Sequence, residues 1–300
     1  MSSWSSIPDP YPQRRPATTP RARAPGCARR GGRAKGAPVT LRIATWNINS
    51  VRLRAEAVSR LLREEAPDVL CLQETKSPVE KLPLDAFAAL GWRHVVARGQ
   101  KGYNGVMILS RVPIEDAGDR GFCGRGDARH VAARLPSGTI LHNFYVPAGG
   151  DLPDPVANPK FRHKLDFLDE MRAWFAAEQP RGAILVGDLN IAPREDDVWS
   201  HKQLLRVVSH TPVEVEAMAA MQAAGGWVDV TRAHIPEGRL YSWWSYRAPD
   251  WQAADKGRRL DHVWATPDLA ERSGGSRILR AARGWDGPSD HVPVLAEFEA

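Results

Sequence analysis

From Val39 onward, short apolar runs of strand length alternate with longer stretches of helical periodicity. This alternation restricts the chain to folds in which helices cover β-sheets, the α/β class. Strands are predicted at 41–45, 69–72, 105–110, 140–146, 183–186, 260–265 and 292–298. Apolar side chains recur at helical spacing within 51–62, 161–175 and 215–221, so helices are predicted there. Because no Pro- or Gly-rich linker follows residue 38, we expect one domain over residues 39–300.

Residues 1–38 have a different composition, rich in Arg and Pro. They carry a net charge of +7, whereas the whole chain carries +6, so the remaining residues are close to neutral. Such a segment buries too little surface to offset its ordering entropy, so we predict a disordered basic tail. Three interpretations stay open: a miscalled upstream start, a basic arm that strengthens nucleic-acid binding, or an organelle-targeting peptide.

Composition excludes several classes of protein. No apolar stretch approaches the roughly 18 residues that a membrane span needs, and no secretory signal is present, so we expect a cytoplasmic protein without membrane contact. Cys27, Cys71 and Cys123 are an odd number at wide spacing, which argues against a disulfide framework or a CxxC metal site.

Polar side chains follow the ends of three predicted strands: Asn47 and Asn49, Glu74, and Asp188 and Asn190. Because ligands bind at the carboxyl ends of strands in α/β sheets, these side chains are expected to converge. Asp290 and His291 precede the last strand instead. They would join the same edge if that strand runs antiparallel to the others, which predicts a mixed sheet.

An oxygen-rich set of this kind suits Mg²⁺ or Mn²⁺ better than zinc. The chemistry that such an ion supports best is displacement at phosphate. His291 could then donate to a phosphate oxygen if Asp261 fixes its tautomer. Each residue also has a structural interpretation: Asp290 as a turn former, His291 as a satisfied buried histidine. Glu74 is harder to explain structurally, because an unpaired carboxylate at the end of an apolar strand is costly.

Eight sequence blocks then follow one another over most of the chain after residue 38: WNINSVR at 46–52, QETK at 73–76, KGYNGV at 101–106, NFYVP at 143–147, GDLNIAP at 187–193, SWWSYR at 242–247, RRLDHVW at 258–264 and SDHVPV at 289–294. In this order they resemble the exonuclease III family of bacterial DNA-repair nucleases and its abasic-site endonuclease relatives, within the endonuclease, exonuclease and phosphatase superfamily. The resemblance implies a four-layered α/β sandwich, with two mixed β-sheets packed face to face and helices outside.

The resemblance also implies a metal site. Glu74 would be the principal ligand of Mg²⁺, with Mn²⁺ as a substitute, and Asn49 and Asp290 would contribute directly or through water.

Catalytic roles are implied for six further residues. Asp188 would activate or position the attacking water and Asn190 would orient it, while Asn47 holds the site together and touches phosphate. Tyr145 would lie near the leaving 3′ oxygen, and His291, held by Asp261, would stabilise the pentacovalent phosphorus.

For DNA, the resemblance implies that Trp243 and Leu260 line a pocket for a flipped-out abasic sugar. Tyr103 would probe the DNA groove, and Lys101 would contact the phosphate backbone. Core packing for the tryptophan and a solvated surface position for Tyr103 and Lys101 are the structural alternatives.

Two positions depart from the family pattern: Arg258 replaces an aromatic or long aliphatic residue, and Ala148 replaces Gln or Asn. Both bear on substrate preference.

Taken together, the resemblance implies a monomeric, Mg²⁺-dependent DNA-repair phosphodiesterase acting on duplex DNA in a bacterial cytoplasm, in association with the nucleoid. It would cleave 5′ to abasic sites and degrade or clean 3′ ends to leave a 3′-hydroxyl. The alternatives are a superfamily phosphodiesterase or phosphatase acting on RNA, lipid or inositol phosphates, and a non-catalytic DNA-binding relative.

Overall fold

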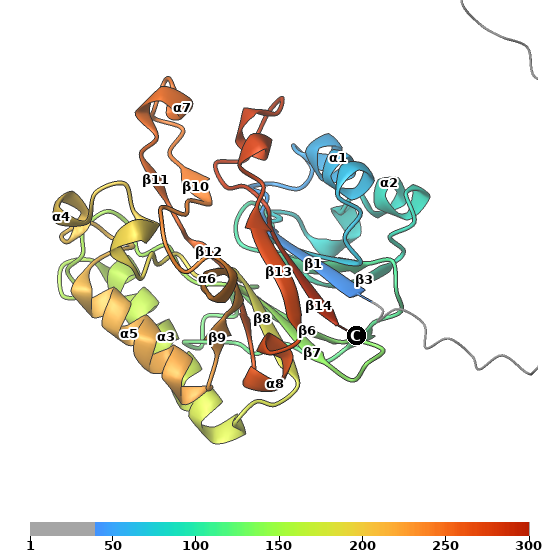
Figure 1. Ribbon diagram of the computed structural model, residues 1–300, viewed down its shortest axis with the longest axis horizontal. Helices are drawn as coiled ribbons and strands as arrows, with labels where there is room; N and C mark the ends of the chain where they lie inside the picture. Colours follow the sequence, from blue (N-terminus) through green and yellow to red (C-terminus); the bar gives the residue numbers. More distant parts are fainter. Residues whose placement is uncertain (1–39, 300) are drawn as a thin grey trace, which may run out of the picture. The chain divides into compact units, whose positions relative to one another are not determined.

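The computed structural model describes residues 40–299, so the predicted tail at 1–38 lies outside the described residues. Two six-stranded sheets form the centre of this part (Figure 1). The first sheet has the order β13 (Ser273–Ile278), β14 (Val294–Glu299), β1 (Thr40–Asn47), β2 (Val69–Gln73), β4 (Val106–Ser110), β3 (His94–Arg98). The second has the order β5 (Glu115–Asp116), β6 (His130–Arg134), β7 (Ile140–Tyr145), β8 (Ala183–Asp188), β12 (Asp261–Ala265), β9 (Val228–Asp229).

Helices flank both sheets, and a small hairpin stands at one end (Figure 1). The hairpin pairs β10 (Trp243–Trp244) with β11 (Gly257–Arg258). The helices are α1 (Ala55–Glu64), α2 (Leu84–Ala89), α3 (Pro159–Glu178), α4 (His201–Leu204), α5 (Pro212–Ala224), α6 (Val230–His234), α7 (Trp251–Ala254) and α8 (Pro267–Ala270). Short 3₁₀ turns occupy Val79–Lys81, Glu195–Asp197 and Arg280–Gly284.

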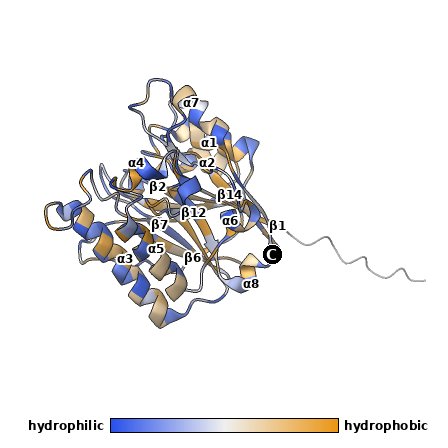
Figure 2. Cartoon of the chain, turned by 60° about the vertical axis from the view of Figure 1, so that its left-hand side comes forward, coloured by the Kyte–Doolittle hydropathy of each residue, from blue (hydrophilic) through white to orange (hydrophobic). Residues whose placement is uncertain are grey.

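The alternation of side chains along each strand produces the layers. In β1, Ile43 faces a core shared by the two sheets, while its neighbour Ala44 faces the core beneath α1 and α2. In β12, Val263 likewise belongs to the shared core, and Trp264 packs toward α3 and α5. Hydrophobic residues accordingly run along the central strands, and hydrophilic ones appear on the outer helices (Figure 2). The result is the four-layered α/β sandwich that the resemblance implied.

Each sheet contains one parallel pair of strands joined by a crossover helix. In the first sheet β1 and β2 are parallel and connected through α1; in the second, β7 and β8 are parallel and connected through α3. Antiparallel strands flank both pairs, and β14 runs antiparallel to β1, as predicted from the polar residues before it. Both sheets are therefore mixed, and each presents two strand carboxyl ends for a site.

Local signals explain the best-predicted helix, α3. Asn158 caps its N-terminus by accepting a hydrogen bond from the Lys160 amide at 3.0 Å, and Pro159 occupies the first position. The predicted helix at 51–62 starts later, at Ala55, because residues 51–54 form turns.

All seven predicted strands are present, with ends shifted by up to two residues. The strands that were not predicted are short or lack a long apolar run: β13 reads SGGSRI, whereas β3 and β6 have runs of only three apolar residues, in HVVAR and HVAAR. Of the three cysteines, Cys71 and Cys123 lie within residues 40–299, and both are free. No helix in this range is both long and apolar enough to cross a membrane.

Candidate active site

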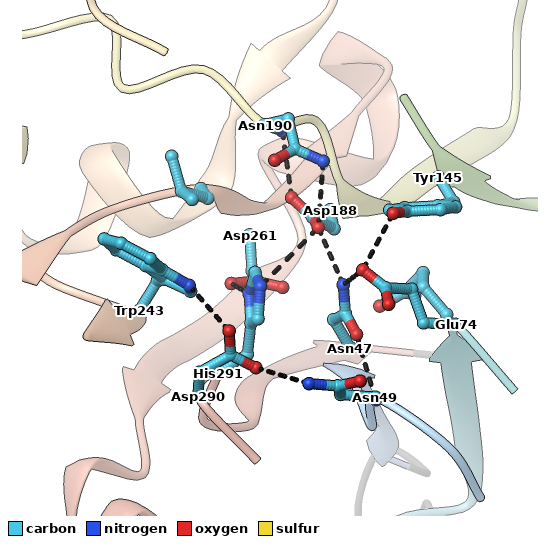
Figure 3. Close-up of polar contacts among 12 residues, drawn as sticks. Asn47, Asn49, Glu74, Tyr145, Asp188, Asn190, Trp243, Asp261, Asp290 and His291 are labelled. Carbon is cyan, nitrogen blue, oxygen red and sulfur yellow. Dashed lines mark hydrogen bonds and ion pairs between the residues drawn. The ribbon is translucent and has the colours of Figure 1, made fainter. Parts of the chain in front are cut away.

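The two parallel strand pairs, β1 with β2 and β7 with β8, belong to different sheets. The side chains at their carboxyl ends nevertheless meet at one place (Figure 3). Asn47 ends β1 and Glu74 follows β2, while Tyr145 ends β7 and Asp188 ends β8. The expected convergence therefore occurs, but across the interface between two sheets and not along the edge of one.

Glu74 is held by three donors. Its Oε1 accepts hydrogen bonds from Asn47 Nδ2 at 2.9 Å and Tyr145 Oη at 2.7 Å, and its Oε2 lies 2.7 Å from Lys76 Nζ. Burial alone would raise the pKa of Glu74, but the Lys76 charge and these hydrogen bonds outweigh it and lower the pKa. Burial, together with the Glu74 charge, raises the pKa of Tyr145 well above its usual value, so the phenol keeps its proton. Glu74 is therefore ionised and lies beside a neutral hydroxyl.

Asp188 is fully buried and accepts hydrogen bonds at both oxygens. Oδ2 accepts from Asn47 Nδ2 at 2.8 Å and from Asn190 Nδ2 at 3.1 Å, and Oδ1 accepts from the Asn190 amide at 2.9 Å. Burial raises the pKa of the Asp188 carboxyl, although the nearby imidazole of His291 opposes this rise. A carboxylate with a raised pKa is a better proton acceptor than an exposed one.

His291 lies between two carboxylates. Its Nδ1 lies 2.8 Å from Asp261 Oδ2, and its Nε2 lies 3.7 Å from Asp188 Oδ2. Burial would lower the pKa of His291, but the charges of Asp261 and Asp188 raise it overall. The imidazole is thus held protonated, with one N–H on Asp261 and the other directed toward Asp188.

Asn49 and Asp290, the other two expected metal ligands, are joined by a hydrogen bond of 3.2 Å. Asn49 Oδ1 lies 2.5 Å from Lys76 Nζ, the same ammonium that contacts Glu74. Oxygens of Glu74 and Asn49 therefore already face one cation, and with Asp290 they form the all-oxygen donor set that Mg²⁺ or Mn²⁺ prefers. These residues fit a hard divalent cation.

A second compact group consists of Asp188, Asp261 and His291, whose potential ligand atoms lie within 4.8 Å of one another. Here the protonated imidazole itself supplies the positive charge between the carboxylates. The group therefore suits a proton-bearing role better than metal binding.

Left-handed backbone marks several residues of the site. Asn49, Glu74, Lys76 and Asn190 have φ between 46° and 55°. Such conformations are unfavourable for residues with a Cβ, least so for Asn, and they concentrate at functional sites. They turn these side chains into the site directly after a strand ends.

A cavity of about 600 Å³ opens beside these residues. Glu74, Asn190, Asp290 and His291 line one part of it. The expected pocket residues Trp243 and Leu260 also line it, as do the two departures from the family pattern, Arg258 and Ala148. Trp243 Nε1 donates to Asp290 Oδ2 at 3.0 Å, which fixes the indole beside the hydrogen-bonded pair of Asn49 and Asp290 (Figure 3).

Tyr103 and Lys101 are not among the residues that line this cavity. Both are exposed in the segment between β3 and β4, with Tyr103 59% accessible. Their predicted DNA contacts stay predictions.

Three residues that hold the site side chains in place were not predicted from the sequence. Lys76 belongs to the QETK block but was given no role there. Ser242 Oγ donates to Asp261 Oδ2 at 2.7 Å, and Ser289 Oγ donates to the Asn47 carbonyl at 2.7 Å. Their positions inside the SWWSYR and SDHVPV blocks were the available signal.

Comparison with known proteins agrees with this geometry. The sequence pattern of the Endonuclease/Exonuclease/phosphatase family matches residues 44–291. The chain belongs to this family. Metal binding is typical of its members. The oxygens of Glu74 and Asn49 that face the Lys76 ammonium agree with such a site.

Individual relatives of the family are similar along nearly their whole length. The exodeoxyribonuclease III of Haemophilus influenzae is 28% identical over 274 residues, covering 86% of this chain and 100% of the relative. An AP endonuclease from Archaeoglobus fulgidus superposes with a TM-score of 0.80 at 34% identity, covering 87% of this chain and all of that one. A 3′ phosphatase from Neisseria, solved with a product DNA hairpin, superposes with a TM-score of 0.80 at 33% identity, covering 87% of this chain and all of that one. The resemblance to the exonuclease III family is therefore confirmed.

Proposed function

We propose that the chain is a metal-dependent DNA-repair phosphodiesterase that cleaves 5′ to abasic sites and processes 3′ ends of duplex DNA, leaving a 3′-hydroxyl. The observation that carries this is that Glu74 and His291 line one cavity from the ends of two different strands. Buried Asp188 lies directly behind them, 3.7 Å from His291 Nε2 and on the same Asn47 amide as Glu74. The relatives are named as exodeoxyribonucleases, an AP endonuclease and a 3′ phosphatase, which supports DNA as the substrate.

In this proposal Asp188 positions the attacking water and accepts its proton at Oδ2, while Asn190 holds the carboxylate in place. His291 Nε2–H donates to a non-bridging phosphate oxygen, and Asp261 fixes the ring through Nδ1. The bond from phosphorus to the 3′ oxygen breaks, and that oxygen leaves with the bonding electron pair and takes up a proton from solvent water. The products carry a 3′-hydroxyl and a 5′-phosphate.

Glu74, Asn49 and Asp290 would hold Mg²⁺, or Mn²⁺ as a substitute. A divalent cation there supplies neutralisation of the charge that develops on the phosphate and leaving oxygens. Tyr145 Oη, hydrogen-bonded to Glu74, would lie beside the leaving oxygen. We also propose that the protein works as a monomer in the bacterial cytoplasm, where its substrate lies.

The direct test uses a duplex with one abasic analogue, beside an intact duplex with a recessed 3′ end, each with Mg²⁺ or with EDTA. Cleavage 5′ to the analogue that EDTA abolishes is expected. Glu74→Ala and Asp188→Asn are each expected to lose at least about 100-fold in rate while the thermal transition is retained. Near-normal rates in either variant would contradict the assigned roles.

If neither duplex is cut, RNA and lipid or inositol phosphates become the substrates to test. If no phosphodiester is cut, the protein is a binding relative.

A further inference from the structure

Arg258 occupies a defined position beside the catalytic residues. In the hairpin, Arg258 pairs with Trp243, and Trp243 in turn bridges to His291. The backbones of Arg258 and His291 are thus two strand spacings apart, roughly 10 Å. Arg258 lines the same cavity as His291 and Asn190, with its guanidinium carbon 5.2 Å from the centre of the Trp243 ring.

The guanidinium is fixed by the protein. Arg258 Nη1 donates to the Val208 carbonyl at 2.9 Å and to Ser209 Oγ at 2.7 Å. The Ser209 amide is itself held by the buried carboxylate of Glu214, at 2.9 Å from each oxygen. Arg258 is therefore a preorganised cation, and its aromatic neighbour restricts it further.

Arg258 differs from the neighbouring buried cations in having no carboxylate partner within the described residues. Arg259, the next residue, forms ion pairs with both Asp197 and Asp229, and buried Lys164 forms one with Glu214. Over residues 40–299, by contrast, Arg258 forms no ion pair with a carboxylate, and its buried Nε has no hydrogen-bond partner. Burial lowers the pKa of Arg258, although the charge of nearby Glu214 opposes this shift. An unpaired, half-buried cation is costly, and a ligand anion would remove that cost.

Two further cations, Arg247 and Lys256, line this cavity together with one additional carboxylate, Asp151. The region beyond the catalytic residues is therefore positively charged. A neutral, base-free sugar has no negative charge with which to pair these cations.

We propose that Arg258 binds the phosphate on the 3′ side of the nucleotide whose sugar occupies the cavity. This inference rests on the proposed function, because it takes the bond broken beside His291 as the 5′ phosphodiester of that nucleotide. The two residues line the same cavity from neighbouring backbone segments. A guanidinium binds phosphate with paired, charge-assisted hydrogen bonds. Arg258 then distinguishes an internal abasic nucleotide, which carries the second phosphate, from a terminal nucleotide that ends in a hydroxyl.

The test uses three duplexes with the same tetrahydrofuran abasic analogue and a 5′ label on the cut strand. The analogue is internal in the first, 3′-terminal with a 3′-phosphate in the second, and 3′-terminal with a 3′-hydroxyl in the third. Arg258→Leu is expected to lower kcat/KM for the first two by about 10- to 100-fold, the effect of losing a charged hydrogen bond. The third substrate is expected to change by less than about 3-fold.

Arg247→Leu removes the same charge from the same cavity and serves as the matched control, with a similar effect expected on all three substrates. Arg258→Lys keeps the charge but not the planar fork, so a smaller loss on the first two substrates alone is expected. This variant also carries the test if Arg258→Leu fails to fold.

Equal losses on all three substrates, or no loss on any, would overturn the role of Arg258 while leaving the proposed function intact. A wild-type protein that cuts none of the three would overturn both.

Discussion

The Asn47 side chain at the end of β1 donates a hydrogen bond of 2.8 Å to the Asp188 carboxylate at the end of β8, and these strands belong to different sheets. The same amide nitrogen also lies 2.9 Å from Glu74 Oε1. One neutral side chain thereby keeps two carboxylates at a fixed separation. An amide is suited to this position because a third carboxylate would repel both.

Asn47→Ala is therefore expected to lower the single-turnover cleavage rate by about 100-fold or more, as when a preorganised donor is removed. Asn47→Asp should be at least as slow, because it adds negative charge between Glu74 and Asp188. Circular dichroism and thermal melting would verify the fold of both variants. A rate within about threefold of wild type for either one would rule out this role.

Lys76 gives a test of the cation site that does not depend on cleavage. Its ammonium contacts both Glu74 and Asn49, so a divalent cation at these oxygens has to compete with it. Lys76→Met should lower Tm in EDTA, because Glu74 loses its counter-charge, and should increase the rise in Tm on adding Mg²⁺ or Mn²⁺.

Lys81→Met, an exposed lysine in the same region, is the control and should match wild type in both respects. If Lys76→Met responds to the cation no more than wild type does, the cation binds elsewhere.

The buried ion pair of Lys164 and Glu214 contacts the backbone of the candidate site. Both side chains are inaccessible; Lys164 Nζ also donates to the Asn190 carbonyl at 2.8 Å, and Glu214 also accepts from Ser209 and Thr211. Lys164→Met and Glu214→Gln should each lower the free energy of unfolding by about 3–5 kcal/mol, since each leaves one buried charge unpaired. The double variant should lose less than the sum, with a coupling of about 1–3 kcal/mol in urea denaturation at pH 7. Additive losses would show that the two charges do not interact.

His262 makes stability depend on pH. Its Nε2–H donates to the Ile191 carbonyl at 2.8 Å, and the buried Nδ1, where a second proton would bind, has no partner among residues 40–299. Burial lowers the pKa of His262 to about 4, below the 6.5 of an unfolded histidine. Between these values the unfolded chain binds more protons, so the free energy of unfolding falls as pH falls, by up to about 3 kcal/mol from this residue.

Urea denaturation at pH 7 and pH 4.5 measures the effect. His262→Gln should show a smaller loss of stability between these pH values than wild type, whereas exposed His234→Gln should show the wild-type loss. An unchanged pH dependence in His262→Gln would contradict the assignment.

Much of this fold could be predicted from sequence, because apolar runs such as those of β2 and β8 are long and end sharply in polar residues. The direction of β14 followed from the position of His291. The assignment of each strand to one of the two sheets could not be predicted from the residue pattern. Strands β1 and β8 are both buried on two faces, so their sequences do not show which strands they pair with.

Within the site, the residue pattern suggested Asp261 as the partner of His291, and the two lie 2.8 Å apart. The pairing of Lys76 with Glu74 and the fixing of Arg258 by Val208 and Ser209 were not predicted. These contacts depend on backbone turns with positive φ, at Glu74 and Ser209 among others, whose direction no local pattern specifies.

The pairing of β14 with β1 joins the first described strand to the last. During synthesis, Glu74 and Asp188 leave the ribosome long before Asp290 and His291 do. The candidate site therefore lacks its imidazole until the last described strand has paired with the first.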